Sequence, residues 1–168
     1  VRLSTAVADN HGDIGSNAVD LSNSYSASIT RGATGYASTA MGTNTEASGT
    51  YSTAMGISTE ASGSVSTAMG GGTTASGEVS TAMGQSTEAS GTYSTAMGIS
   101  TEASGSVSTA MGGGTTASDY GSLVIGRYNS SGSTVTNSAT AFSTANTAFV
   151  IGNGTGTGED ASDAFKVM

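Results

Sequence analysis

The sequence of 168 residues contains no cysteine, proline or tryptophan, and only 10% of its residues are charged. Without cysteine the chain forms no disulfide and offers no thiolate to a metal, and it is compatible with export. The absence of proline suits long strand ladders, because every residue keeps a backbone N–H that can be hydrogen-bonded. Aromatic residues make up 5% of the chain, so we do not expect a thick conventional core.

Positive charge is also scarce. The cations are Arg2, Arg31, Arg127 and Lys166, and the formal net charge is -8. Nucleic acids and anionic membranes bind clustered lysine and arginine, so we predict no nucleic-acid partner and no direct membrane contact for this chain. No apolar run reaches the length of a membrane span or of a signal-peptide core.

What the chain does contain is one short repeat. Ser38-Thr39-Ala40-Met41-Gly42 returns five times at intervals of fourteen residues, and Ala-Ser-Gly lies between the copies, first at 47–49. A fixed short period indicates stacked, nearly identical units, whereas a disordered Gly/Ser linker needs no such register. Residues 45–76 are identical to 87–118. Such a duplication is harmless only if whole added units lengthen the object without disturbing it.

The unit predicts an all-β fold, a parallel β-roll (solenoid) of 14-residue coils. Fourteen residues are too few for a helical hairpin repeat of about 33 or more, but they accommodate two short strands and two tight turns. Coils that pair in parallel stack about 4.8 Å apart. We expect Ser-Thr-Ala-Met and Thr-x-Ala-Ser to be the strands, each followed by a glycine where the chain turns. The predicted turn glycines after the first strand are Gly42, Gly56, Gly70, Gly84, Gly98, Gly112 and Gly126.

Side chains alternate along a strand, so Ser and Ala face one way while Thr and Met face the other. Small alanines suit the inside of a flat roll, which leaves a stripe of long apolar side chains outside. An exposed stripe of this kind is a liability for a monomer and predicts burial against other copies. In the alternative, Met fills the roll and Thr39 and its equivalents line the surface. The predicted trimer-packing or core stripe is Met41, Met55, Met69, Met83, Met97, Met111, Ile125 and Ile151.

The repeat divides the chain into four parts. Residues 1–36 are predicted to form irregular N-terminal rungs or a cap, and 37–126 form the regular repeats. Ser-Leu-Val-Ile-Gly at 122–126 keeps the frame, but the next match lies 26 residues on. We therefore predict an inserted loop or hairpin at 127–147 and a C-terminal rung and cap at 148–168.

Few residues are candidates for chemistry. His11 is the only histidine, and we interpret it as a polar turn residue rather than a metal ligand or an acid–base group. The glycine-rich run at 152–158 has no following lysine and is not a P-loop. Ice-binding solenoids present paired threonines on one flat strand, whereas each strand here offers a single outward threonine, so we do not favour that function. We predict no catalytic residue, no metal, no cofactor and no enzyme activity.

One position of the unit is acidic in four of its six copies. Stacked coils would place neighbouring carboxylates side by side, which could serve acid–base chemistry or bind a cation. We favour a solvated acidic edge that keeps the rod soluble. The acidic residues are Glu46, Glu60, Glu88 and Glu102, and Thr74 and Thr116 occupy the position in the other two copies.

The fourteen-residue unit resembles the head repeat of trimeric autotransporter adhesins, the YadA family. That repeat has a Ser-Val-Ala-Ile-Gly strand, two variable residues, a second strand of small residue-x-Ala-x-Gly and two more variable residues. Residues 38–42 and their copies match at Ser, Ala and Gly, with Thr and Met in place of Val and Ile. Residues 122–126 match still more closely in their apolar positions. The resemblance covers 37–126 and, less closely, 148–168.

The resemblance implies a left-handed parallel β-roll, assembly as a homotrimer and display on a bacterial cell surface. Stalk and outer-membrane anchor would lie in regions absent from this chain. It implies a non-enzymatic adhesin head that attaches to host cells or to an extracellular-matrix protein. The alternative is a structural β-roll module of a trimeric phage tail fibre or spike, which flanking sequence would distinguish. Ligand-binding residues are unknown; we expect them in variable pairs such as Ile57-Ser58, Gly71-Gly72 and Gln85-Ser86, and at 127–147.

Overall fold

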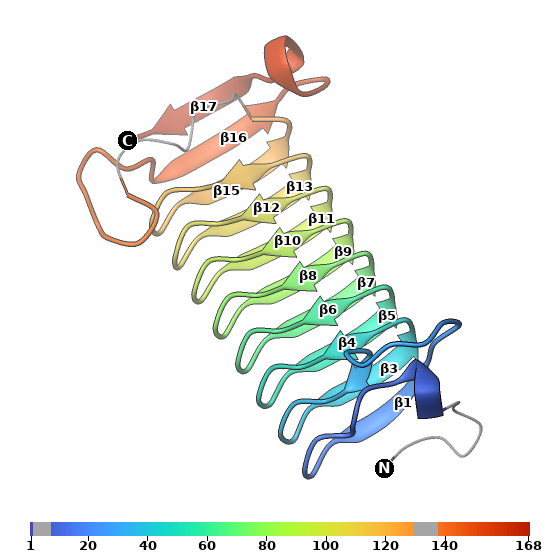
Figure 1. Ribbon diagram of the computed structural model, residues 1–168. Helices are drawn as coiled ribbons and strands as arrows, with labels where there is room; N and C mark the ends of the chain where they lie inside the picture. The colour runs from blue at the N-terminus through green and yellow to red at the C-terminus, as the bar shows by residue number, and fades with distance from the viewer. Residues whose placement is uncertain (2–7, 130–137) are drawn as a thin grey trace.

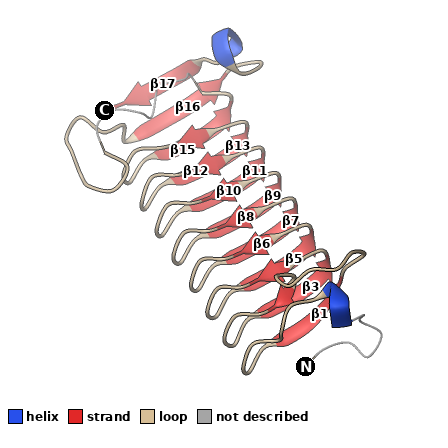
Figure 2. Cartoon of the chain, viewed as in Figure 1, coloured by secondary structure: helices blue, strands red, loops and turns tan. Residues whose placement is uncertain are grey.

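The computed structural model describes residues 1, 8–129 and 138–168, and it confirms an all-β solenoid of fourteen-residue coils (Figure 1). Each coil from β1 to β14 contributes one long strand and one short strand. The long strands form a ten-stranded sheet and the short strands a seven-stranded sheet. Apart from two short 3-10 helices, η1 (Ala8–Asn10) and η2 (Gly158–Asp160), the described chain consists of strands, turns and loops (Figure 2).

The strands follow the repeat closely. The long strands are β1 (Val19–Asn23), β3 (Thr39–Thr43), β5 (Thr53–Ile57), β7 (Thr67–Gly71), β9 (Thr81–Gln85), β11 (Thr95–Ile99), β13 (Thr109–Gly113), β15 (Leu123–Arg127), β16 (Phe149–Asn153) and β17 (Asp163–Val167). The short strands are β2 (Gly32–Ala33), β4 (Glu46–Ala47), β6 (Glu60–Ala61), β8 (Thr74–Ala75), β10 (Glu88–Ala89), β12 (Glu102–Ala103) and β14 (Thr116–Ala117).

Parallel pairing places like residues beside like residues. In the pair of β5 and β7, Ala54 lies beside Ala68 and Met55 beside Met69. The strands begin one residue later than the sequence predicts. Ser52 N–H donates to the Gly49 carbonyl across the preceding turn, at 3.2 Å. The ladder therefore starts at Thr53.

The predicted turn glycines lie inside the long strands, as their fourth residues, and the bend towards the short strand comes two residues later, at Ser58 in the coil of Gly56. Gly56 has φ of +128°, a backbone conformation that residues other than glycine rarely adopt. A Cβ atom built on Gly56 would lie 2.0 Å from the carbonyl oxygen of Gly70 in the next coil. The strand thus continues through the glycine instead of ending before it, and the glycine serves the close stacking of coils.

The interior is thin and built from alanine. One alanine from each of the long strands β3 to β13 and one from each short strand face each other, and none of these alanines has exposed surface. Buried serines and threonines, such as Ser52 and Thr59, flank the alanines along the chain in each coil. Larger side chains take the alanine position only at the two ends of the roll, at Asp20 in the first coil and at Val124 and Val150 near the C-terminus. The short sheet ends at β14, so these valines, within the described chain, have no short strand opposite them and find more room.

One further coil precedes the regular repeats. Strand β1 pairs in parallel with β3, with Val19 beside Thr39, and β2 pairs with β4. The offset between Val19 and Thr39 exceeds fourteen because residues 24–31 form a longer connection between β1 and β2 (Figure 1). This longer connection is why the frame does not continue cleanly upstream of Tyr36 in the sequence.

At the C-terminal end β16 pairs in parallel with β15, and β17 pairs with β16 in the antiparallel direction. The open end of the short sheet is covered by a side chain. Thr116 N–H donates to Oδ1 of Asn129 at 2.8 Å, and Nδ2 of Asn129 donates to the Thr116 carbonyl at 3.1 Å. The amide of Asn129 thus takes the place of a neighbouring backbone, which protects the edge from pairing with another chain.

The insertion predicted at 127–147 is described in part. Residues 130–137 lie outside the described residues, and 138–147 form turns without a strand. Thr147 N–H donates to Oδ2 of Asp119 at 2.8 Å, and Tyr120 N–H donates to the Ser138 carbonyl at 3.0 Å. These bonds hold the described part of the insertion against the turn at 119–121.

Candidate interaction surfaces

The outer face of the long sheet is uncharged and partly apolar. Its outward positions in β3 to β13 carry threonine, methionine and one variable residue, none of them charged. The methionines are half-buried by their stacked neighbours; Met55, for example, keeps 36% of its surface exposed. The ladder of Met41, Met55, Met69, Met83, Met97 and Met111 continues into Ile125 and Ile151. We call this surface the methionine face.

The methionine face becomes more apolar towards the C-terminus. Leu123 and Phe149 take the place of threonine there and lie side by side. The rings of Phe149 and Phe165 are 6.1 Å apart, and Val167 is beside Phe149 on the last strand. The long sheet therefore ends in an apolar cluster that continues the ladder.

The outer face of the short sheet is acidic. The register places Glu46 beside Glu60 and Glu88 beside Glu102, as the stacking of coils predicts. Three of these side chains are exposed and Glu46 is half-buried. The two faces of the roll thus differ in charge, since the methionine face carries none in β3 to β13.

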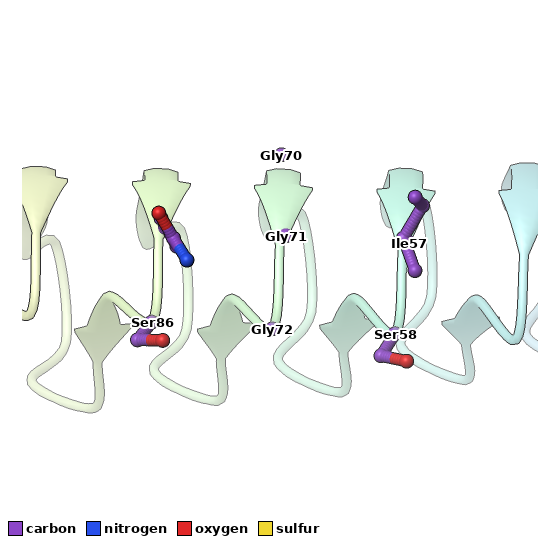
Figure 3. A pocket seen from close by; sticks show the side chains of 7 residues that line it. Ile57, Ser58, Gly70, Gly71, Gly72 and Ser86 are labelled. Atoms are coloured by element: carbon purple, nitrogen blue, oxygen red, sulfur yellow. The ribbon is translucent and has the colours of Figure 1, made fainter.

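The edge that joins each long strand to the following short strand varies between coils. At Gly71-Gly72 it is hollowed into a shallow notch of about 550 Å³, bordered by Ile57-Ser58 on one side and Gln85-Ser86 on the other (Figure 3). Ile57 is 63% exposed, so the notch has one apolar wall and one polar wall. We call this side of the roll the notched edge.

A second notch lies three coils further on, as the duplication requires. It is about 440 Å³ in volume and opens at Gly113-Gly114, with Ile99 again on one side. Its other wall differs, because Arg127 and Tyr128 replace the Gln-Ser pair. The arginine guanidinium lies 5.3 Å from the centre of the Tyr128 ring. The two notches therefore share an apolar wall and differ in charge.

His11 lies inside the N-terminal end of the roll rather than on a solvated turn. It is 6% exposed and its Nδ1 is 3.6 Å from Oδ2 of Asp20. Ser22 Oγ donates to Oδ1 of Asp20 at 2.6 Å and lies 3.4 Å from Nδ1 of His11. The hydroxyl is directed to the carboxylate and the group is buried, so the arrangement is not that of an activated serine nucleophile.

Sequence reasoning missed Asp20 and Ser22. Asp20 occupies the frame position of the inward alanine, beside Ala40. Aligning residues 19–23 with the repeat residues 39–43 would have shown that Asp20 takes the alanine position. The longer connection after β1 hides this alignment in the sequence. Within residues 1, 8–129 and 138–168, no group of three His, Asp or Glu side chains is placed to hold a metal ion.

Comparison with known proteins agrees with this architecture. A family model described as the YadA head domain repeat (2 copies) matches residues 33–59, 61–87, 75–101, 89–114 and 103–129. A search of curated proteins finds no match. In the part of the chain that the structure describes, no helix has the length and apolar character needed to cross a membrane.

Proposed function

Because the chain belongs to the YadA head domain family, whose repeat model matches more than half of it, we propose that it attaches a bacterial cell to host cells or to an extracellular-matrix protein. The family match is the observation that carries the proposal. Heads of this family are adhesin-type structural modules and not enzymes. The adhesive site would lie on the notched edge, where the coils differ and the two notches open.

We further propose that the head is a homotrimer displayed at the cell surface and that the methionine face packs against the other copies. The face is uncharged along β3 to β13, whereas the short sheet would bring like charges together if it lay between identical chains. Three copies present three notched edges to one surface. Simultaneous contacts raise the overall avidity well above the affinity of each site.

Assembly is tested by placing charge on the methionine face. We expect light scattering to give three chain masses for the native protein and one for the double variant Met69→Asp, Met83→Asp. An unpaired carboxylate buried between subunits costs about 3–5 kcal/mol, and each chain would contribute two. Far-UV circular dichroism should stay that of a β protein, because both side chains point out of the roll.

The matched control is Thr74→Asp, which adds a charge to the outer face of the short sheet and should remain trimeric. A native protein that is monomeric at all concentrations would disprove the trimer. A double variant that stays trimeric would show that the methionines face elsewhere.

Adhesion is tested with the purified native protein on immobilised matrix proteins and on cultured host cells. We expect saturable binding to one of them, and a loss of about tenfold in affinity for Ile57→Asn, Ile99→Asn, a change of roughly 1.4 kcal/mol. Both isoleucines border a notch and are at least 60% exposed. No binding to any of these surfaces, or equal binding by the double variant, would count against the proposed site.

A further inference from the structure

The edge opposite the notches carries a stripe of exposed apolar side chains. It is formed by the turns that return from each short strand to the next long strand, and the residue concerned directly precedes the buried serine of each unit. Exposed fractions run from 39% at Val79 to 58% at Tyr93. We call this set the apolar edge: Tyr51, Val65, Val79, Tyr93 and Val107.

The backbone at these positions is left-handed. Values of φ lie between 56° at Val79 and 61° at Val107. A β-branched or aromatic residue is unfavourable in this conformation, whereas glycine and asparagine adopt it readily. The chain itself uses both at the ends of the ladder, Asn17 with φ of 61° and Gly121 with φ of 69°. The conformation of the turn therefore does not explain why the middle coils carry bulky side chains at this position.

The hydrogen bonds of the turn do not explain the bulky side chains either. Val65 N–H donates to the Thr50 carbonyl and Val79 N–H to the Ser64 carbonyl, each at 2.8 Å. Gly121 N–H makes the corresponding bond to the Ser106 carbonyl at 2.9 Å, so a residue without a side chain serves the ladder equally well. Strained positions that persist point to a role of the side chain, and these side chains point to solvent in the single chain.

The stripe has defined ends. At the N-terminal end the Tyr51 ring meets the Tyr36 ring edge to face at 5.5 Å, and the Tyr36 hydroxyl accepts a hydrogen bond from Asn17. At the C-terminal end the insertion covers the neighbouring turn, because Ser106 N–H donates to the Ala139 carbonyl at 2.7 Å. The coils of Tyr51 to Val107 lie between, with one apolar residue each.

This stripe fits a second copy of the same chain. A closed ring of three subunits has head-to-tail interfaces, in which a patch on one subunit contacts a different patch on the next. Each subunit therefore needs two different contact patches. The methionine face is one uncharged patch, and the apolar edge repeats at the same coil spacing because both belong to the same coils. The short sheet is acidic, and the notched edge is interrupted by glycine. These features leave the apolar edge as the matching patch.

We propose that the apolar edge of one subunit packs on the methionine face of the next, coil against coil. This inference rests on the proposed trimer and adds which surfaces form it. The roll would then lie with the long sheet towards the neighbouring subunits and the acidic short sheet towards solvent. The notched edge stays free on each subunit, available to a ligand.

The test replaces valine by a residue that favours the left-handed turn. In the variant Val65→Asn, Val79→Asn, Val107→Asn, each turn gains the residue that the chain uses at Asn17. We expect far-UV circular dichroism to show that the roll still folds. Sedimentation over a dilution series should show that the trimer of the variant dissociates at concentrations at least 100-fold higher than the native trimer does. A second variant, Tyr51→Asn, Tyr93→Asn, should show the same shift.

The matched control is Tyr25→Asn, Ile29→Asn, which removes two exposed apolar side chains from the connection at 24–31, outside both proposed contact surfaces, and should leave the trimer intact. The inference would be overturned if the valine and tyrosine variants dissociated at the same protein concentration as the native trimer. It would also be overturned if the control variant dissociated as readily as they are expected to. A native protein that is monomeric would instead overturn the proposed trimer on which the inference rests.

Discussion

Replacing Gly84 by alanine is expected to lower the free energy of unfolding by about 3 kcal/mol or more, while the same change at Gly71 leaves it nearly unchanged. Gly84 has φ of +126°, and a Cβ atom there would lie 2.0 Å from the Gly98 carbonyl oxygen. Positions of this kind cost of order 1–3 kcal/mol for other residues, and overpacking adds about 1–3 kcal/mol. Gly98 cannot move away, because it is stacked in the same manner on Gly112.

Gly71 is the matched control, one residue after the equivalent glycine of its own coil. A Cβ atom on Gly71 meets nothing within 4 Å, and Ile57 and Gln85 lie beside it in the ladder. Alanine there should be neutral or slightly stabilising, by about 0.4–1 kcal/mol. Urea unfolding followed by circular dichroism at one fixed protein concentration measures both variants. Equal unfolding of the two would show that close coil stacking at the strand glycines is unimportant.

The fold was predictable because the repeat determines register as well as secondary structure. Once coils stack every fourteen residues, Ala54 must meet Ala68 and Glu46 must meet Glu60, and the structure has both pairs. The inward position of alanine follows from strand alternation and from the small interior of a two-strand coil. In these respects the sequence of one unit is enough, since every other unit copies it.

The ends of the roll and its turns were not predictable in this way. Asp20 takes an alanine position, and only the longer connection at 24–31, seen in the structure, explains why the period fails there. Asn129 completes the short sheet with a side-chain amide, a contact that no periodicity signals. The left-handed backbone at Val65 is equally hidden, because the residue type argues against it.

A charge placed inside the middle of the roll is expected to have the second large effect. Ala75→Asp should lower the free energy of unfolding by about 3–5 kcal/mol at neutral pH, since it leaves an unpaired buried charge. Ala75 is fully buried, and its neighbours in the ladder, Ala61 and Ala89, are buried alanines as well. Thr74→Asp is the matched control in the same strand; its side chain points outwards, so the loss there should stay within about 1 kcal/mol.

The first coil shows what such a carboxylate requires. Asp20 is tolerated at an alanine position because Ser22 donates both its hydroxyl and its backbone N–H to it, at 2.6 and 3.1 Å, and His11 lies beside it. Ala75 has less to offer a carboxylate, because its partners in the adjacent coils are alanines and the nearest buried polar side chain along the chain is the single hydroxyl of Thr73.

Acid should rescue the buried variant. Burial raises the pKa of the introduced carboxyl above its unfolded value of about 3.9, so the folded state holds the proton more tightly than the unfolded state. The loss of stability is therefore complete above the raised pKa and is relieved as the pH falls through it towards about 4. Urea unfolding of Ala75→Asp and Thr74→Asp at pH 7 and pH 4 measures this directly. If the two variants unfold alike at pH 7, Ala75 does not lie in a dry interior; if the gap between them persists at pH 4, the cost is one of volume rather than charge.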